Sequence, residues 1–302
     1  MNGRKNITGS AVLAVSLMAA DGAAVYCYGL RALTVVVLCV GVCMLCDIVC
    51  SVARHRHLDA EDLSSLTTGL ALAAMFPASV PYRVCILSCV FAVCIVKHPL
   101  GGLIPPAAAG YVFAELSFPM GVLRYPRMGT LAVGSASDGL YRLSELNVFS
   151  DNSPYSDFEL IIGRVPGPMA CGFIVLHIIC ALVLVLSKKS SLLTFLLPVV
   201  CTVTWCGVFD GAETVRKALF GGMLVFCSAY ISSVNGYVPE KPLSRLGYAL
   251  FLSAVTIAVT EISTVESPAV YACILCAPFR TLEKISSVSD GDEVRTEQTE
   301  KS

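Results

Sequence analysis

Hydrophobic residues fall into long runs along most of the chain, and short polar or basic segments separate these runs. Most of these runs are roughly 16 to 23 residues long, which is the length that an α-helix needs to cross about 30 Å of hydrocarbon. The pattern therefore predicts an all-α polytopic membrane protein. Ten membrane-spanning helices are predicted, over residues 11–28, 30–52, 63–80, 82–97, 102–118, 169–187, 192–209, 218–235, 246–262 and 267–280.

The composition agrees with this class. Hydrophobic residues make up 56% of the chain, charged residues 14%, and the mean hydropathy is +0.75, whereas a soluble domain carries about 25% charged residues. The start "MNGRKNITGSAVLAVSLMAA" also has the basic end and apolar middle of a cleaved signal peptide. A retained first helix is the simpler interpretation, because many further apolar runs follow it.

Lysine and arginine are distributed unequally between the loops on the two sides of the membrane. One side holds eleven, namely Arg4, Lys5, Arg54, Arg56, Lys97, Lys188, Lys189, Lys241, Arg245, Arg280 and Lys284, and the other holds four, namely Arg31, Arg83, Arg216 and Lys217. The positive-inside rule then predicts that both termini are cytoplasmic. We expect one transmembrane domain over residues 1–285 with an outer loop at 119–168, and a disordered cytoplasmic tail at 286–302.

The two halves of the chain resemble each other. "LTTGLALAAMFPASVPY" followed by "KHPLGGLIPPAAAGY" in the first half is loosely repeated as "ALFGGMLVFCSAY" followed by "VPEKPLSRLGYAL" in the second. Glycine pairs and prolines at matching places are typical of paired repeats with broken helices. Glycine and proline are also common in membrane helices in general, where small residues let backbones approach.

Ionisable residues inside apolar runs indicate function, because burying a charge in lipid is costly. Asp21 interrupts the first predicted span, Asp47 lies near the cytoplasmic end of the second, and Glu261 closes the ninth. Asp21 and Asp47 are candidates for an ion path, and each of the three acids could equally pair with a neighbouring helix. For Asp21 we favour the functional interpretation.

The chain has fifteen cysteines, and nearly all of them lie inside the predicted spans. Cys39, Cys43, Cys46 and Cys50 share one helical face, which offers a contact with a partner. A packing stripe is the favoured interpretation, because a buried cysteine behaves as a small hydrophobic residue.

The order of several short motifs resembles a known family. "YCYGLRAL", Asp47, "DLSSLTTGLALAAMFP", "VKHPLGGL", "GYVFAELSFP", "GRVPG" and "LFGGML" follow one another as in the D subunit of Rnf-type ion-translocating electron-transfer complexes. The chain is similar, more distantly, to the B subunit of the sodium-pumping NADH:quinone oxidoreductase. This resemblance runs collinearly from about residue 11 to residue 285, and the order of the motifs carries it.

The resemblance implies about ten transmembrane helices in two inverted-repeat halves with broken helices, in a urea-transporter-like arrangement. It also implies FMN, linked by a phosphoester to the last residue of a Ser/Thr-Gly-Ala-Thr motif on the outer side. The subunit would act with other subunits of a six-subunit complex in the bacterial cytoplasmic membrane, with Na⁺ or H⁺ as the coupling ion. It would be part of an oxidoreductase that is not catalytic through this chain alone.

Residues 134–137, "GSAS", fall where the family places its flavin-bearing motif. Ala136 matches the alanine of the motif, Ser137 matches the acceptor threonine, and Gly134 and Ser135 occupy the first two positions in swapped order. Serine provides the hydroxyl that a phosphoester requires. The alternative is an ordinary polar turn, for which "SASDG" is a normal composition.

Other family positions differ as well. "GGLIPPAAAGY" keeps Pro106 and Ala107 of a longer family turn and lacks its two asparagines, whose amides would hydrogen-bond flavin, backbone or ion. "ISSVNGYVPEKP" replaces a turn that contains Thr-Asp, and "VESP" replaces a Pro-Glu-Gly turn. These departures leave two alternatives open beside a working electron-transfer subunit. One is a flavin-free scaffold subunit, and the other is a urea-transporter-like solute or ion channel.

Other classes of function lack support in the sequence. An independent hydrolase or transferase is not indicated, because the chain has no Gly-rich phosphate loop, no HExxH motif and no nucleophile elbow. Nucleic-acid binding is not indicated either, because the net charge is −1 and no basic patch lies outside the topology-setting loops.

Overall fold

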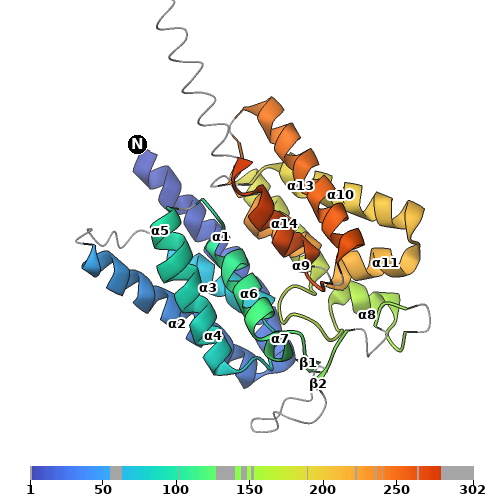
Figure 1. The fold of residues 1–302 in the computed structure, drawn as a ribbon, viewed down its shortest axis with the longest axis horizontal. Coiled ribbons are helices and arrows are strands. Elements are labelled where there is room, and N and C mark those ends of the chain that lie inside the picture. Colours follow the sequence, from blue (N-terminus) through green and yellow to red (C-terminus); the bar gives the residue numbers. More distant parts are fainter. Residues whose placement is uncertain are drawn as a thin grey trace, which may run out of the picture.

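A computed structural model of the chain describes residues 2–54, 63–101, 103–126, 140–143, 148–150, 153–188, 190–221, 223–234, 237–239, 241–263 and 265–279, and for residues 2–9 the backbone only. The described part is mostly helical, with one two-stranded sheet (Figure 1). The all-α class predicted from the apolar runs is therefore confirmed.

The first half forms one bundle, drawn in blue and green in Figure 1. Helix α2 packs against α3 and α4, α1 packs against α3, and α6 packs against α3, α4 and η1. The elements are α1 (Asn2–Tyr28), α2 (Leu30–Ala53), α3 (Ser64–Met75), α4 (Tyr82–Val90), the π-helical segment η1 (Phe91–Lys97), α5 (His98–Leu100), α6 (Pro106–Ser117) and α7 (Pro119–Val122).

A connecting segment follows and contains β1 (Tyr125–Pro126), β2 (Leu140–Tyr141) and α8 (Asp157–Ile162). The second half forms the other bundle, in which α13 packs against α10 and α14, and η3 contacts α9, α10 and α14. Its elements are α9 (Ile174–Leu186), α10 (Leu192–Phe209), α11 (Ala212–Arg216), η2 (Lys217–Gly221), α12 (Leu224–Phe226), η3 (Cys227–Ser232), α13 (Pro242–Ile262) and α14 (Pro268–Cys276).

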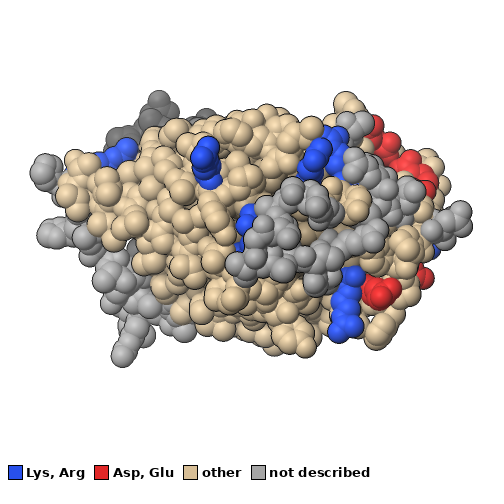
Figure 2. All heavy atoms as spheres, turned by 90° about the horizontal axis from the view of Figure 1, so that it is seen from below, with Lys and Arg blue, Asp and Glu red and all other residues tan. Residues whose placement is uncertain are grey.

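Five helical stretches are long and apolar enough to cross a membrane, namely Ser10–Tyr28, Leu30–Ala53, Tyr82–Leu100, Leu192–Phe209 and Pro242–Ile262. A sixth is possible if the pair Ala212–Gly221 and Leu224–Ser232, bent by 52°, forms one span. Large apolar side chains such as Val37, Leu182 and Val208 point outward on these and neighbouring helices, as lipid-facing residues do. Figure 2 views the molecule from below, and most of the described surface visible there is uncharged. The chain is thus a multi-pass membrane protein.

Five of the predicted spans contain helices shorter than expected: α3 and α6 have 12 residues each, α9 has 13, α14 has 9, and the span 218–235 is divided among η2, α12 and η3. Proline explains most of these limits, because it cannot continue a helix and favours extended backbone before it. Pro77 follows the end of α3, and Pro106 and Pro268 begin α6 and α14. The apolar runs therefore located the helices correctly and overestimated the length of the helices in these five spans.

The two bundles meet where helices are interrupted. The backbone N–H of Met169 donates to the carbonyl of Phe76 at 2.9 Å, and that of Ala170 donates to the carbonyl of Ala74 at 3.1 Å. Helix α1 also contacts α9, and α6 contacts α14. One hydrophobic cluster includes residues of α1, α3, α9, η3 and α14, so both halves share a single core.

Candidate functional site

The loop predicted to carry the flavin connects β1 to β2. These two strands pair in antiparallel fashion, so the two ends of the loop lie side by side. Gly134, Ser135, Ala136 and Ser137 belong to this loop and lie outside the described residues. The structure therefore positions the base of the loop, and covalent attachment at Ser137 stays a prediction.

A small hydrophobic cluster fixes the base of this loop. The ring of Phe149 lies so close to Gly221, at the end of η2, that a Cβ added to the glycine would come within 2.8 Å of the ring. The hydroxyl of Ser79 donates to the carbonyl of Arg124 at 2.7 Å, which ties the chain before β1 to the first bundle. The buried members of the cluster are Tyr125, Leu143, Val148, Phe149, Leu160 and Val165.

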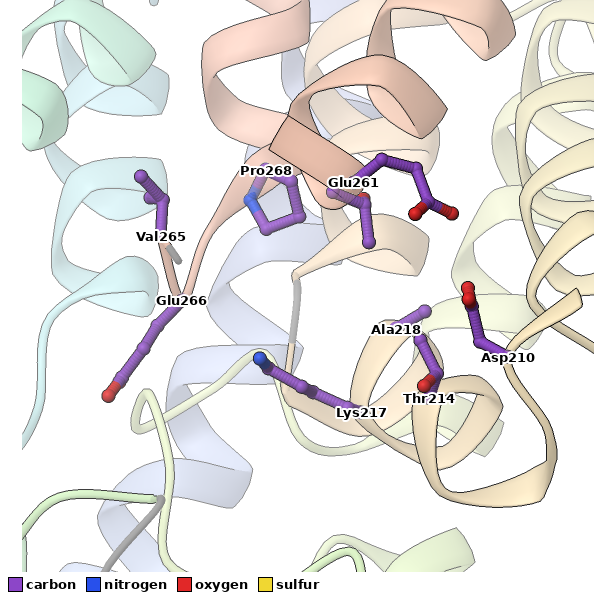
Figure 3. Close-up of a pocket in the computed structure, with 9 residues that line it drawn as sticks. Asp210, Thr214, Lys217, Ala218, Glu261, Val265, Glu266 and Pro268 are labelled. Carbon is purple, nitrogen blue, oxygen red and sulfur yellow. The ribbon is translucent and has the colours of Figure 1, made fainter. Parts of the chain in front are cut away.

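A pocket of about 250 Å³ lies near this base (Figure 3). It is formed where α10 and α13 end, where α14 begins, and along α11 and η2. Glu266 connects the pocket to the loop, because its carboxylate is hydrogen-bonded by Tyr125 of β1. The lining residues are Asp210, Thr214, Lys217, Ala218, Thr260, Glu261, Val265, Glu266 and Pro268.

Acidic groups dominate this pocket. The indole N–H of Trp205 donates to Glu261 at 2.9 Å, and Asp210 is hydrogen-bonded to the same carboxyl group. Partial desolvation and the neighbouring Glu261 carboxyl raise the pKa of Asp210, as expected when two carboxyl groups share one proton. With Glu266 the pocket holds three acids and a single lysine, Lys217, so its charge favours cationic or neutral groups over anions.

Asp21 lies in the first bundle on α1, away from this pocket. Its side chain is 2% exposed, and neither carboxyl oxygen has a hydrogen-bond partner among the described residues. It interacts electrostatically with Cys171, just before α9, and with Tyr230 of η3. The predicted intramembrane acid is thus buried at the junction of the two bundles.

His177 of α9 is fully buried near the same junction. One ring nitrogen, Nε2, lies 2.7 Å from the carbonyl oxygen of Ala170, and Nδ1 lies 3.2 Å from the hydroxyl of Tyr230. Because a carbonyl only accepts, Nε2 carries the hydrogen and Nδ1 of the neutral ring accepts from Tyr230. The sequence-based prediction missed His177, although a histidine inside the apolar run "VLHII" is a signal of buried polar function.

Asp47 lies in a different environment, near the C-terminal end of α2. Its carboxylate accepts from the ammonium of Lys97 at 3.0 Å and contacts the ring of His98 at 2.9 Å. Lys97 also donates to the hydroxyl of Ser65 at 2.6 Å. Asp47 and Asp21 are not brought together, because roughly 15 Å of helix rise separates their levels on α1 and α2. The structure gives Asp47 a partner, and among the described residues it gives Asp21 none.

A second buried acid joins the halves. The hydroxyl of Ser267, preceding α14, donates to Glu115 of α6 at 2.7 Å, and Tyr271 also hydrogen-bonds to this carboxylate. Glu115 was missed as well, and its position within "YVFAELSF" is the signal that would have found it.

The cysteines of α2 face the α4–η1 helix within the chain. Cys50 and Cys94 have their sulfur atoms 3.5 Å apart, and the thiol of Cys89 lies 3.6 Å from the carbonyl of Cys39. All fifteen cysteines are free. No group of three or more metal-binding side chains occurs among the described residues, and the stripe packs two helices of the same chain together.

Comparison with known proteins bears on this arrangement. The D subunit of the Na(+)-translocating ferredoxin:NAD(+) oxidoreductase complex of Acetobacterium woodii is 33% identical over 109 residues, covering 35% of this chain and 34% of that protein. The D subunit of the ion-translocating oxidoreductase complex of Shewanella frigidimarina is 31% identical over 157 residues, covering 49% and 44%. The same subunit of Shewanella amazonensis is 31% identical over 171 residues, covering 54% and 48%.

The aligned part of the chain spans less than half the length of each of these curated relatives. A family model extends much further and matches residues 4–282, which include both bundles, the loop base and the pocket. On this match, the chain belongs to the NQR2, RnfD, RnfE family.

Proposed function

We propose that the chain is a membrane subunit of an ion-translocating oxidoreductase complex, in which electron transfer is coupled to ion movement across the membrane. The family match over residues 4–282 carries this proposal. The named relatives are D subunits of such complexes, and the long apolar helices suit a membrane subunit. The partners are other subunits in the bacterial cytoplasmic membrane, and this chain alone is not catalytic.

Purification from the native membrane tests this role. An affinity tag on the chain, with mild detergent, should recover a multi-subunit complex that transfers electrons between ferredoxin and NAD⁺, the reaction named for the Acetobacterium woodii relative. An unrelated multi-pass protein with the same tag is the control. Recovery of the chain by itself, with solute uptake after reconstitution, would favour a channel instead.

We also propose ten membrane crossings in two inverted, urea-transporter-like halves. The packing supports this arrangement. The α2–α4 contact in the first half corresponds to the α10–α13 contact in the second half. The contacts of α6 with η1 and α3 correspond to those of α14 with α13 and η3. Both α6 and α14 begin with a proline in the first turn. Five crossings in the first half bring the chain to the opposite side of the membrane, so an equivalent second half must be inverted. Both termini are then cytoplasmic.

The cofactor of this subunit, we propose, is FMN, attached by a phosphoester to Ser137. The hydroxyl of Ser137 and the place of "GSAS" in the family's motif order support it. The nearby pocket does not fit the flavin phosphate, because three acids and one lysine line it and the acids would repel an anion. We therefore place the phosphate on the loop, derive no electron-transfer step through the pocket, and leave the position of the flavin ring open.

Flavin fluorescence in a denaturing gel, with intact mass, tests the attachment. Protein from the native membrane should be fluorescent and heavier by one FMN, and Ser137→Ala should lose both signals. The matched control is Ser135→Ala, which removes a hydroxyl two residues away and should keep the flavin. No flavin in the unaltered protein would point to a scaffold subunit, and loss in both variants would point to a disrupted loop.

The ion path remains a proposal for Asp21 and Asp47. Asp47 is neutralised by Lys97, so it is the weaker candidate and its contacts already explain its presence in an apolar run. Asp21 has no such partner among the described residues. The name of one relative specifies Na⁺ as the ion that its complex translocates. The side chains and carbonyls around Asp21 indicate which ion this chain exchanges.

A further inference from the structure

Asp21 occupies the centre of the candidate span Ser10–Tyr28. An ionised carboxylate that is 2% exposed, with no hydrogen-bond partner among the described residues, costs far more free energy than a neutral carboxyl group. A buried acid in a membrane helix therefore needs a counterion, a bound cation or a proton. These three possibilities can be separated by the groups around it.

No basic side chain among the described residues pairs with Asp21. Helix α3, which packs on α1, carries no titratable residue. In α9 the titratable groups are His177 and Cys180, and both nitrogens of the His177 ring are hydrogen-bonded to Ala170 and Tyr230, so neither contacts Asp21. From η3 and the chain before α9, Tyr230 and Cys171 lie within electrostatic range of Asp21, and neither side chain can carry a positive charge.

Helix α2 also packs on α1. Its basic side chain is Arg31, which lies next to the turn at Gly29 between α1 and α2. Its guanidinium donates to the carbonyls of Ala78, Ser79 and Val80 at 3.0 to 3.4 Å. The remaining ionisable groups of α2 are Asp47, which is bound to Lys97, and its cysteines. A counterion for Asp21 is therefore absent from the described residues of the helices packed against it.

A sodium ion at Asp21 would need several oxygen ligands, and interrupted helices usually supply them as free carbonyls. Here three carbonyls of the interrupted segments already have donors. The carbonyl of Ala74 accepts from the Ala170 N–H and from the Cys171 thiol, that of Phe76 accepts from Met169, and that of Ala170 accepts from His177. These three carbonyls are therefore less available as sodium ligands than free carbonyls would be.

We propose that the Asp21 carboxyl is a proton-binding site at the junction of the two bundles, and that the ion exchanged there is H⁺ and not Na⁺. The step is the breaking of one O–H bond, in which the electron pair stays on the carboxylate and the proton leaves to water or to the next group of the path. The proposal rests on the proposed ion-translocating function, because only then does the site carry transport.

Labelling with dicyclohexylcarbodiimide tests it in the complex in native membranes. This apolar reagent forms a stable N-acylurea with a protonated carboxyl group in apolar surroundings and does not react with a carboxylate. Peptide mass spectrometry should find the adduct on Asp21, to the same extent in NaCl and in KCl. Asp21→Asn should lose this adduct, and the control Asp47→Asn should keep it. Protection by NaCl and not by KCl would overturn the proposal in favour of a sodium site.

Infrared spectroscopy covers the case in which the reagent does not reach the site. The difference spectrum between the unaltered complex and Asp21→Asn should contain the carbonyl stretch of one protonated carboxyl group. No adduct on Asp21 together with an unchanged infrared band in Asp21→Asn would overturn the proposal. Both readouts report protonation alone, so a protonated Asp21 in a chain that purifies without partners would refute the proposed function and leave the site standing.

Discussion

Gly163 is the residue at which the backbone most clearly requires glycine. It ends α8 with φ of 82°, and a Cβ placed there would lie 2.7 Å from the carbonyl oxygen of Gly172. Left-handed backbone and a contact with fixed backbone both penalise a side chain. Gly163→Ala should therefore destabilise the protein by roughly 1–3 kcal/mol, measured as a lower unfolding temperature in detergent.

Gly41→Ala is the matched control for that change. Gly41 is inside α2, and an added Cβ would meet nothing within 4 Å. Alanine is favoured over glycine in a helix by roughly 0.5–1 kcal/mol, so this variant should unfold at the same or a slightly higher temperature. Equal losses in the two variants would show that the approach of Gly163 to Gly172 does not determine stability.

Glu159 gives α8 a dependence on pH. The backbone N–H of Ser156 donates to its carboxylate at 2.9 Å and lowers the pKa of Glu159, with the Ser156 hydroxyl adding to the effect. A lowered carboxyl pKa means that this cap is complete above the ordinary pKa of glutamate and is lost as the pH falls through the lower folded value. Hydrogen exchange of the α8 amides, corrected for intrinsic rates, should show this loss, and Glu159→Gln should show no such transition.

Sequence reasoning at this scale found the residues whose chemistry conflicts with lipid, and it did not find their partners. Asp21 and Asp47 were both identified as acids in apolar runs, with only a slight preference for function at Asp21. Their difference depends on Lys97 and His98, about fifty residues away in sequence from Asp47, and such long-range contacts leave no local pattern. For Ser137, motif order gave a candidate, and the surrounding loop lies outside the described residues.

At the scale of elements, the Asp47–Lys97 ion pair links α2 to η1. Both side chains are mostly buried, with exposures of 21% and 15%, so removing one charge leaves the other without compensation. Asp47→Asn should destabilise the protein by roughly 1–3 kcal/mol. The double variant Asp47→Asn with Lys97→Met should recover part of this loss, because it removes the uncompensated ammonium. Thermal unfolding in detergent measures both, and equal stability of all three proteins would contradict the link.

The position of the elements was more predictable than their length. Every predicted span contains a described helical segment, because an apolar run of this length has to be buried in lipid or in protein. The lengths of α3, α6 and α14 depend on Pro77, Pro106 and Pro268. The run pattern alone does not show whether a proline bends a membrane helix or ends it, and here these three prolines mark helix boundaries.

The whole molecule combines short helices from both halves in one core. Helices α3, α6, α9 and α14 are too short to cross about 30 Å alone, and α3 is almost entirely buried. The long helices α2, α10 and α13 carry nearly half of the large exposed apolar side chains, and the outer face of α9 carries several more. The breaks after α3 and before α9 lie inside the protein with Asp21 and His177, where non-helical backbone is tolerated at membrane depth.

Reporter fusions distinguish ten crossings from six. If all ten segments cross, residue 188 is cytoplasmic and residue 211 is outside, so a fluorescent protein fused after 188 should fluoresce and alkaline phosphatase fused after 211 should be active. If only the long helices and the bent pair cross, the segment after α5 stays outside until α10, and both results reverse. A fusion at the C-terminus is cytoplasmic in either case and serves as the control. The reversed result would refute the ten crossings and would leave the second half inverted, because three crossings before it also bring the chain to the opposite side of the membrane.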